Sequence, residues 1–259
     1  MESGVCRDFP MTNAHSKAHS GKECKPRRRF AAGRSGEGSE SGSGIRGRAP
    51  LCYTEGMKRI RGIVFDFGGV ISLPPEPSFY ESIAALAGWS RETLLAGWRR
   101  HRSGMDADFI SIRELYRRIA ADLGQCLSAA TQDALAKADF DAWVRPNPET
   151  LAWARELKAA GLRVGILTNM PTAFLPWFDR CAAAFRALAD AEVVSGAEHL
   201  VKPGEAIYRL MERRIGLPPE ALCFFDDTQA NVDAARALGW RAERFVSAAQ
   251  ARAALEAMA

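Results

Sequence analysis

Four short apolar runs, each ending in polar residues or glycine, constrain the fold of this chain more than any other feature of its sequence. They are rich in β-branched and aromatic residues, and helix-like stretches separate them. Continuous apolar strands that alternate with helices are typical of a parallel sheet covered on both faces. The pattern therefore predicts an α/β fold with a Rossmann-like, doubly wound parallel sheet. The runs are Gly62–Phe65, Leu162–Leu167, Ala221–Phe225 and Arg241–Val246, and Ala191–Val194 is a weaker fifth candidate.

Amphipathic stretches between and after these strands predict the covering helices. Gly161 and Gly239 follow two of them, at the position where a glycine ends a helix. The predicted helices are Pro148–Ala160, Ala173–Phe185, Gly204–Ile215, Thr228–Leu238 and Ala248–Met258.

One interval breaks the alternation of strand and helix. Residues 72–145 contain no strand candidate and form too long a segment for a simple crossover. We predict a helical insertion that divides the α/β core into residues 58–71 and 146–259. It is expected to lie over the carboxyl ends of the strands, where open α/β sheets bind ligands. Its predicted helices are Ser78–Gly88, Arg91–His101, Ile112–Leu123 and Ser128–Phe140.

The first 57 residues differ in composition from the rest of the chain. They are rich in Gly, Ser, Arg and Lys, and we predict a disordered basic tail. Residues 1–56 carry ten basic and six acidic side chains, which leaves 25 of each in the remainder and accounts for the whole net charge of +4. A balanced domain gives no support to nucleic-acid binding. Met57 directly precedes the first strand, which suggests the hypothesis that the tail is an upstream extension that the working protein lacks.

Several other classes of protein are disfavoured. No stretch reaches the roughly 18 uninterrupted apolar residues that a membrane span requires, and the N-terminus lacks the apolar segment of a secretory signal. The six cysteines form no C-x-x-C pair or other metal-binding spacing. We therefore expect a cytoplasmic protein with reduced thiols that acts on neither membranes nor nucleic acids. Oligomeric state is not readable from the sequence.

Polar residues stand at or just beyond the ends of successive predicted strands. Each alone has a common structural explanation as a turn former, a helix cap or a surface residue. In a parallel sheet, however, the strand ends meet at one crevice, so we expect these side chains to form one site. They are Asp66, in DFGGV; Thr168 and Asn169, in LTNM; Lys202, in HLVKPGEAIY; and Asp226 and Asp227, in FFDDTQANVDAARALGW.

The order Asp, Thr, Lys and Asp-Asp, with a helical insertion after the first strand, closely resembles the haloacid dehalogenase (HAD) superfamily over residues 58–259. The DFGGV form is similar to the branch that contains sugar-1-phosphate phosphatases and the N-terminal phosphatase domains of epoxide hydrolases. The resemblance implies that the insertion is a helical cap. It also implies a magnesium-dependent phosphatase that acts on a small phosphorylated metabolite, with a sugar phosphate as one candidate.

The resemblance implies a role for each residue near the phosphate. Asp66 attacks phosphorus and forms an aspartyl-phosphate. Thr168 donates its hydroxyl to a phosphate oxygen, and Lys202 neutralises charge on Asp66 and on the phosphate. The turn at Gly68–Gly69 lets backbone N–H groups approach the phosphate closely. Asn169 contacts the substrate or orients the loop.

The implied cofactor is Mg²⁺, which prefers oxygen ligands and retains several waters. Asp66, the carbonyl of Gly68 and Asp227 are its implied ligands, with Asp226 acting directly or through water. The acidic pair also bears on the nearest enzymatic alternative, a 2-haloacid dehalogenase, which needs no metal. Adjacent carboxylates would repel the carboxylate of a haloacid unless a cation lay between them, so the pair favours the phosphatase.

Gly68 departs from the pattern, because phosphatases of the superfamily usually carry a second Asp there as general acid and base. Such help is worth about 10²- to 10⁴-fold in rate. Three explanations are open: another group of the chain replaces this Asp, the substrate has a leaving group that departs without an acid, or the protein is a non-catalytic, phosphate-binding regulatory pseudoenzyme. Retained activity is favoured, because the resembling branch carries this glycine. Substitutes within the insertion, each more commonly a solvated surface residue, are Glu76, His101, Asp106 and Asp108.

Aromatic and basic side chains of the insertion are further candidates for substrate contacts. Tryptophans stack on sugars or bases, although core packing is the commoner use. Arginines bind a second anionic group, although a solvated helix face is commoner. The residues concerned are Trp89, Trp98 and Trp143 and Arg99, Arg100 and Arg102.

Overall fold

A computed structural model describes residues 60–258 of the chain. The basic tail predicted over residues 1–57 lies outside these residues. Within the described part, every helix is too short or too polar to cross a membrane.

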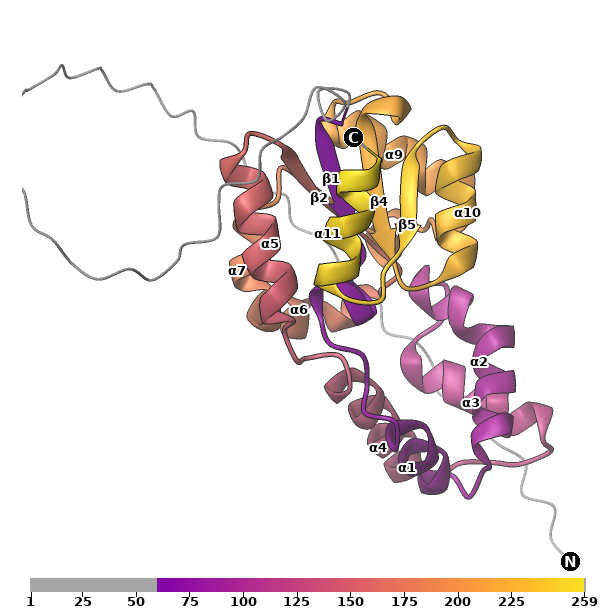
Figure 1. Cartoon of the computed structure of the whole chain (residues 1–259). Coiled ribbons are helices and arrows are strands. Elements are labelled where there is room, and N and C mark those ends of the chain that lie inside the picture. Colours follow the sequence, from indigo (N-terminus) through magenta and orange to yellow (C-terminus); the bar gives the residue numbers. More distant parts are fainter. Residues whose placement is uncertain (1–59, 259) are drawn as a thin grey trace, which may run out of the picture. The chain divides into compact units, whose positions relative to one another are not determined.

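Five parallel strands form a single sheet. They are β1 (Gly62–Phe65), β2 (Arg163–Thr168), β3 (Ala191–Val194), β4 (Leu222–Asp226) and β5 (Arg241–Arg244). Their order across the sheet is β3-β2-β1-β4-β5, so the chain winds outward from β1 in both directions (Figure 1). Every residue of β1 and β4 is buried, which explains why both read as continuous apolar runs. The predicted doubly wound α/β fold is confirmed.

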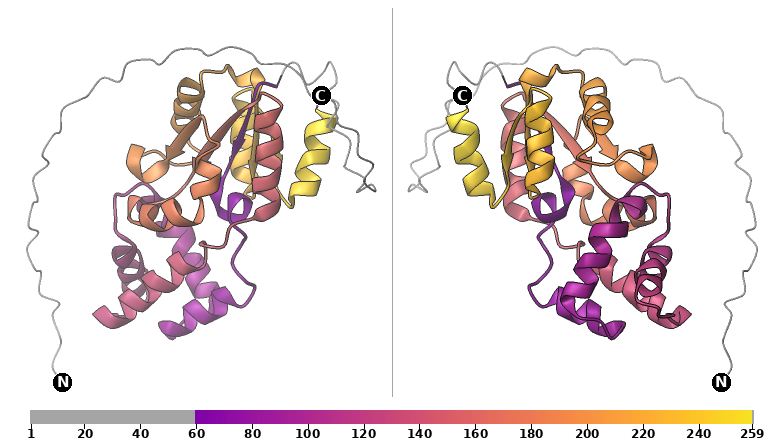
Figure 2. Two further views of the ribbon diagram at one scale, coloured as in Figure 1. Left: turned by 90° about the vertical axis from the view of Figure 1, so that its left-hand side faces the viewer. Right: turned by 90° about the vertical axis from the view of Figure 1, so that its right-hand side faces the viewer.

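Helices cover both faces of this sheet. They are α5 (Pro148–Ala159), α6 (Leu175–Cys181), α7 (Ala183–Arg186), α8 (Ser195–Glu198), α9 (Glu205–Ile215), α10 (Gln229–Ala237) and α11 (Ala248–Ala257), with the 3₁₀ turns η3 (Thr172–Phe174) and η4 (Pro219–Ala221). Phe65 and its neighbours on one face pack against α5, α6, α7 and α11, and Val64 on the other face packs against α9 and α10. Figure 2 shows the sheet between these two layers of helices. Successive strand residues point to opposite faces, so both faces are apolar.

Two details of these helices bear on the sequence predictions. Gly161 and Gly239 have φ of 88° and 90°, which fits the helix-ending role expected of them. The helix predicted over Ala173–Phe185 is divided into η3, α6 and α7. Ala182 interrupts it, with a φ of −106°. The bend allows Phe185 to reach the sheet, where its ring lies 5.4 Å from that of Phe65 in an edge-on arrangement.

Four helices lie between β1 and β2. After the turn η2 (Phe67–Ile71) they are α1 (Phe79–Leu86), α2 (Arg91–Asp106), α3 (Ile112–Asp122) and α4 (Ala129–Asp141). They lie beyond the carboxyl ends of the strands (Figures 1 and 2). The two connections to the core run side by side, because Ser72 and Pro146 form an antiparallel bridge and the N–H of Leu73 donates to the carbonyl of Arg145 at 2.7 Å. The chain therefore leaves and re-enters the core at one place.

Serines begin three of these helices. The hydroxyls of Ser90, Ser111 and Ser128 each accept a hydrogen bond from the backbone N–H three residues further on, which satisfies a donor that the first helical turn leaves free. Packing of an apolar face also stabilises these helices. Leu115 and Ile119, for example, stand on one face of α3 and are almost completely buried.

Helix α2 continues to Asp106, past the end predicted at His101. Ser103 and Gly104 are weak helix formers, so local preference indicated an earlier end. Met105, whose side chain is completely buried, stabilises the additional turn through packing. This turn includes Asp106, whose side chain lines the cavity described below.

Candidate active site

Asp66 follows β1 directly and stands at the middle of the carboxyl edge of the sheet. Its backbone N–H donates to the carbonyl of Phe225 at 2.9 Å, which extends the pairing with β4. Its Oδ1 accepts the backbone N–H of Phe67 at 2.7 Å, and the residue is only 8% exposed. Backbone pairing with β4 therefore fixes the main chain of Asp66, and the N–H of Phe67 orients its carboxylate.

Gly69 allows the chain to turn away from the sheet immediately afterwards. Its φ of 73° is strained for other residues, and an added Cβ would lie 2.9 Å from Oδ2 of Asp227. The acidic side chain at the end of β4 thus approaches the backbone of η2 closely.

Lys202 places a buried ammonium against this edge. Its Nζ lies 2.8 Å from Oδ1 of Asp66 and 2.6 Å from Oδ2 of Asp226, and it donates to the carbonyl of Leu167 at 2.9 Å. Burial by itself would lower the pKa of Lys202, but the carboxylates of Asp226 and Asp66 raise it above its ordinary value. Lys202 is therefore a fixed cation beside Asp66.

Asn169 fixes the backbone of Lys202 from the end of β2. Its Oδ1 accepts the N–H of Lys202 at 2.8 Å, and its Nδ2 donates to the carbonyl of the same residue at 2.9 Å. Of the two roles expected for Asn169, these contacts support orientation of the loop. The side chain also lines the cavity described below.

Asp226 is completely buried and uses both carboxylate oxygens inside the protein. Oδ1 accepts the backbone N–H of Thr228 at 2.8 Å, and Nδ2 of Asn231 lies 3.0 Å from each oxygen. With Lys202 on Oδ2, the carboxylate is a hydrogen-bonded counter-ion. The sequence analysis does not single out Asn231, which stands on the first turn of α10 and reaches back to the last residue of β4.

Asp227 is the more accessible acid of the pair, and Oγ1 of Thr228 donates to its Oδ1 at 3.1 Å. Ligand oxygens of Asp66, Asp226 and Asp227 lie within 4.8 Å of one another. Burial raises the pKa of Asp66 to about 8 in spite of Lys202, and the two neighbouring acids add to the shift. The pKa of Asp227 is raised for the same reasons, burial and Asp226. Three carboxylates facing one ammonium form a cluster whose charge and donor set suit Mg²⁺.

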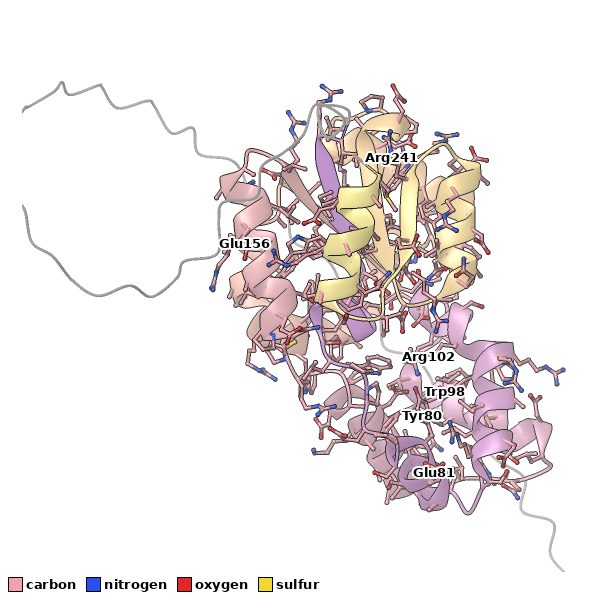
Figure 3. The ribbon with its side chains drawn as sticks, viewed as in Figure 1. Tyr80, Glu81, Trp98, Arg102, Glu156 and Arg241 are labelled. Carbon is pink, nitrogen blue, oxygen red and sulfur yellow. The ribbon has the colours of Figure 1, made fainter. Side chains whose placement is uncertain are left out.

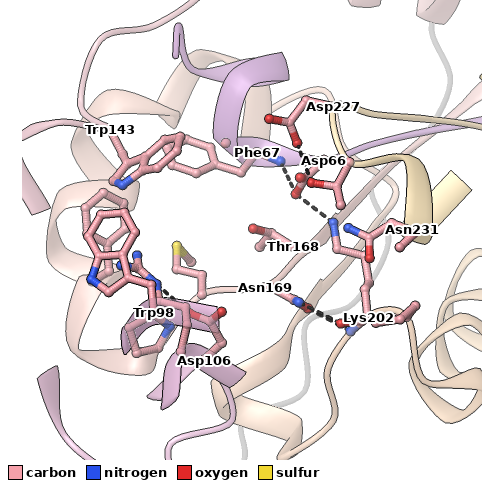
Figure 4. A pocket seen from close by; sticks show the side chains of 18 of the residues that line it. Asp66, Phe67, Trp98, Asp106, Trp143, Thr168, Asn169, Lys202, Asp227 and Asn231 are labelled. Carbon is pink, nitrogen blue, oxygen red and sulfur yellow. Dashed lines mark hydrogen bonds and ion pairs between the residues drawn. The ribbon is translucent and has the colours of Figure 1, made fainter. Parts of the chain in front are cut away.

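A cavity of about 480 Å³ lies between this edge and the helices α1, α2 and α4, a volume typical of small-molecule sites (Figure 4). Thr168, which is 1% exposed, lines it together with most of the predicted site residues. Gly69 and Asp226 are the exceptions and lie behind the lining. The lining residues from the predicted set are Asp66, Gly68, Thr168, Asn169, Lys202 and Asp227, and the aromatic ones from the insertion are Tyr80, Trp98, Phe140 and Trp143.

Of the four residues of the insertion that could replace the missing general acid and base, one lies at the cavity and three lie outside it. Asp106 lines the cavity, whereas the other three do not. Each of those three pairs with a residue outside the cavity: Glu76 with Arg145, His101 with Asp122 and Asp108 with Thr172.

Asp106 belongs to an acid–arginine cluster in the insertion, formed by Arg102, Asp106, Tyr116 and Asp139. Arg102 donates two hydrogen bonds to Asp139, at 2.7 and 3.2 Å, and the hydroxyl of Tyr116 donates to the same carboxylate at 2.7 Å. Arg102 also lies over the ring of Trp98, 4.7 Å from its centre. Figure 3 shows where these two residues lie in the insertion. The guanidinium of Arg102 is thus bound to Asp139 and packed on Trp98. The sequence analysis does not predict the contacts of Tyr116 and Asp139.

Comparison with known proteins places this arrangement among hydrolases. A family model described as haloacid dehalogenase-like hydrolase matches residues 60–239. The chain is 27% identical over 188 residues to a phosphatase of Mycobacterium tuberculosis (strain CDC 1551 / Oshkosh), covering 71% of this chain and 86% of that protein. It is 29% identical over 203 residues to an (S)-2-haloacid dehalogenase of Pseudomonas putida, covering 71% and 83%.

A similar solved structure is a HAD family enzyme of Bacteroides thetaiotaomicron in complex with magnesium and inorganic phosphate. The two structures align with a TM-score of 0.56 at 18% sequence identity, covering 71% of this chain and 93% of the other. At that identity the likeness establishes a shared fold.

Proposed function

The chain belongs to the haloacid dehalogenase-like hydrolases, and from this premise we propose that it is a magnesium-dependent phosphatase acting on a small phosphorylated metabolite. One observation carries the proposal. The ammonium of Lys202 joins Asp66 and Asp226 inside a cluster of three carboxylates at the base of a cavity. Such a cluster attracts a divalent cation and, with it, a phosphate.

In this proposal Asp66 is the nucleophile. The contacts described for its side chain engage Oδ1, so we assign the attack on phosphorus to Oδ2. The attack forms an aspartyl-phosphate and releases the alcohol, and water then hydrolyses the acyl phosphate. Lys202 holds the nucleophile in place, and the hydroxyl of Thr168 is available at the cavity wall to bind a phosphate oxygen.

The residues suited to hold Mg²⁺ are Asp66, Asp227 and the carbonyl of Gly68, with Asp226 contributing its charge from behind. When bound, the ion neutralises the negative charge shared by the nucleophile and the phosphate. The internal hydrogen bonds of Asp226 favour an indirect contribution, through its charge or a water.

The cavity favours a monophosphate whose organic part is small and has an apolar or ring face. Its outer wall is mostly aromatic, and sugar rings pack well on such walls. Arg102, the cavity cation of the insertion, is already bound to Asp139, so a second phosphate would find no free partner there. A sugar phosphate fits these conditions.

A 2-haloacid dehalogenase is the second candidate, because the Pseudomonas putida relative bears that name. Its substrate carboxylate needs a cationic partner in the cavity. Lys202 and Arg102, the basic residues that line the cavity in the described part, are both paired with carboxylates. These pairings favour the phosphatase.

Hydrolysis of p-nitrophenyl phosphate, with Mg²⁺ and with EDTA, tests the proposal. We expect metal-dependent turnover that falls to background in Asp66→Asn, because the amide oxygen is a poor nucleophile. Halide release from 2-chloropropionate without metal would instead identify a dehalogenase. A lack of turnover over a broad panel of phosphate esters would favour a phosphate-binding regulatory protein and contradict the phosphatase.

A further inference from the structure

We propose that Asp106, on the last turn of α2, is the general acid and base of the reaction. It would replace the Asp that related phosphatases usually carry at the position of Gly68, which has no side chain. This inference rests on the proposed phosphatase function. It assigns a catalytic role to a residue of the insertion, so that the core alone does not hold the complete site.

The position of Asp106 relative to Asp66 supports this role. Both carboxylates line the same cavity, Asp66 from the sheet edge and Asp106 from the opposite wall (Figure 4). In an in-line displacement the leaving oxygen departs opposite the nucleophile, and the hydrolytic water later enters from that side. A group facing Asp66 is therefore placed to serve both steps.

The space beside Gly68 is already filled. A Cβ added to Gly68 would lie 3.2 Å from Cζ3 of Trp143, closer than an ordinary contact. A carboxylate there would displace this indole. The other acidic or imidazole candidates of the insertion are paired outside the cavity. Of the four candidates for the general acid and base, Asp106 is thus the one that lines the cavity.

The core holds the end of α2 in place. The hydroxyl of Ser195 donates to the backbone carbonyl of Asp106 and accepts the N–H of Met170 at 2.7 Å. The ring Nδ1 of His199 lies 2.8 Å from the carbonyl of Ala107, and Oδ1 of Asp108 accepts the N–H of Thr172 at 3.0 Å. Catalytic groups need such rigid support.

The electrostatic surroundings leave Asp106 able to exchange a proton. The charged groups that influence it are Arg102 and Asp139 in the insertion and Lys202 in the core. Arg102 is only loosely paired with it, at 3.6 Å, because Asp139 takes the two shorter bonds. Burial raises the pKa of Asp106 to about 6, although Arg102 opposes the shift. Both protonation states are therefore accessible near neutral pH.

The proton balance is simple. In the first step Asp66 bonds to phosphorus, the bond from phosphorus to the leaving oxygen breaks, and protonated Asp106 gives its proton to that oxygen. In the second step the Asp106 carboxylate takes a proton from water as the water oxygen bonds to phosphorus. The bond between phosphorus and Asp66 breaks, inorganic phosphate leaves, and both residues return to their starting states.

Pre-steady-state hydrolysis of p-nitrophenyl phosphate by Asp106→Asn tests this role in the full chain with Mg²⁺. Nitrophenolate leaves without protonation, so we expect a burst equal to the enzyme concentration. Slow turnover should follow, lowered about 10²- to 10⁴-fold, because the water lacks its base. The phosphorylated enzyme should accumulate and be visible by intact-protein mass spectrometry. With ribose 5-phosphate, whose leaving alkoxide requires a proton, the burst itself should be lost.

The controls separate this inference from the proposed function. Glu76→Gln removes an exposed acid of the insertion outside the cavity and should behave like the wild type. Asp106→Glu, which keeps a carboxylate, should retain more turnover than Asp106→Asn. If the wild type is active and Asp106→Asn shows the same turnover without a burst, Asp106 has no such role. If the wild type neither turns over nor is phosphorylated, the phosphatase proposal fails with it.

Discussion

Asp226 and Asp227 are adjacent in sequence, yet their surroundings differ. Asp226 is enclosed by Lys202, Asn231 and the N–H of Thr228, whereas Asp227 reaches the surface of the cavity. A charge that is buried and paired is costly to unpair, while a partly exposed carboxylate is free to bind a ligand. The two residues should therefore respond differently to the same substitution.

For Asp226→Asn we expect a loss of about 3–5 kcal/mol in the free energy of unfolding, because the buried ammonium of Lys202 keeps only Asp66 as a charged partner. Asp227→Asn should not lower the free energy of unfolding, because it removes a carboxylate that its acidic neighbours repel, but it should need more Mg²⁺ for half-maximal activity. Urea denaturation and Mg²⁺ titration of turnover measure the two effects. Equal effects of the two variants on Mg²⁺ requirement would contradict the assignment.

Asp106 also provides a stability prediction at the residue scale. Burial raises its folded pKa from 3.8 to about 6. Between these values the folded state holds a proton that the unfolded state has lost, so this group lowers the free energy of unfolding as pH rises through the window. A shift of this size corresponds to at most about 3 kcal/mol. Asp106→Asn should therefore be more stable than the wild type at pH 7 but not at pH 4, as measured by urea denaturation.

Helix α2 connects the insertion with the active site. Its middle packs against α3, and its C-terminal part carries Arg102 and Asp106 to the cavity. Gly97 permits the close approach to α3, because an added Cβ would lie 2.6 Å from Cγ1 of buried Ile119. Gly104, in the same helix, has room for a Cβ, which would make an ordinary contact with Ile110 at 3.7 Å.

These two glycines form a matched pair at the scale of the helix. Gly104→Ala should raise the free energy of unfolding by about 0.5–1 kcal/mol through helix propensity. Gly97→Ala gains the same propensity but overpacks the contact with α3, which costs about 1–3 kcal/mol, so a net loss is expected. Chemical denaturation measures both. Because Gly97→Ala also displaces α2, its KM should rise, whereas that of Gly104→Ala should not.

At the scale of the whole molecule, the sheet edge concentrates negative charge that folding alone does not balance. Burial raises the pKa of both Asp66 and Asp227, and repulsion from the neighbouring carboxylates raises it further. Bringing these carboxylates together therefore opposes folding. A divalent cation bound there would relieve this repulsion. Metal binding should therefore be visible as stabilisation of the entire fold.

We expect Mg²⁺ at about 100 times its dissociation constant to raise the free energy of unfolding by about 2.7 kcal/mol. Thermal unfolding with Mg²⁺ and with EDTA measures the shift. Asp227→Asn should reduce it, because that variant removes a proposed ligand. A shift of the same size in the wild type and in Asp227→Asn would mean that the ion binds elsewhere.

The sheet and the strand-end residues could be predicted from the sequence because their signals are local. Apolar runs such as Gly62–Phe65 identify buried strands over a few residues, and parallel pairing then brings the carboxyl ends to one edge. The family resemblance carried by Asp66, Lys202 and the acidic pair is confirmed by the match over residues 60–239. These features do not depend on how distant side chains pack.

Only the tertiary structure decided which side chains of the insertion face the site. Helix α2 extends past the predicted end at His101. Ser103 and Gly104 are weak helix formers, and burial of Met105 outweighs that local preference. The choice of Asp106 from four equivalent candidates, and the pairing of Arg102 with Asp139, likewise depend on contacts between helices far apart in sequence. Local preferences fix strands and caps, whereas long-range packing determines where a helix end and its charges come to lie.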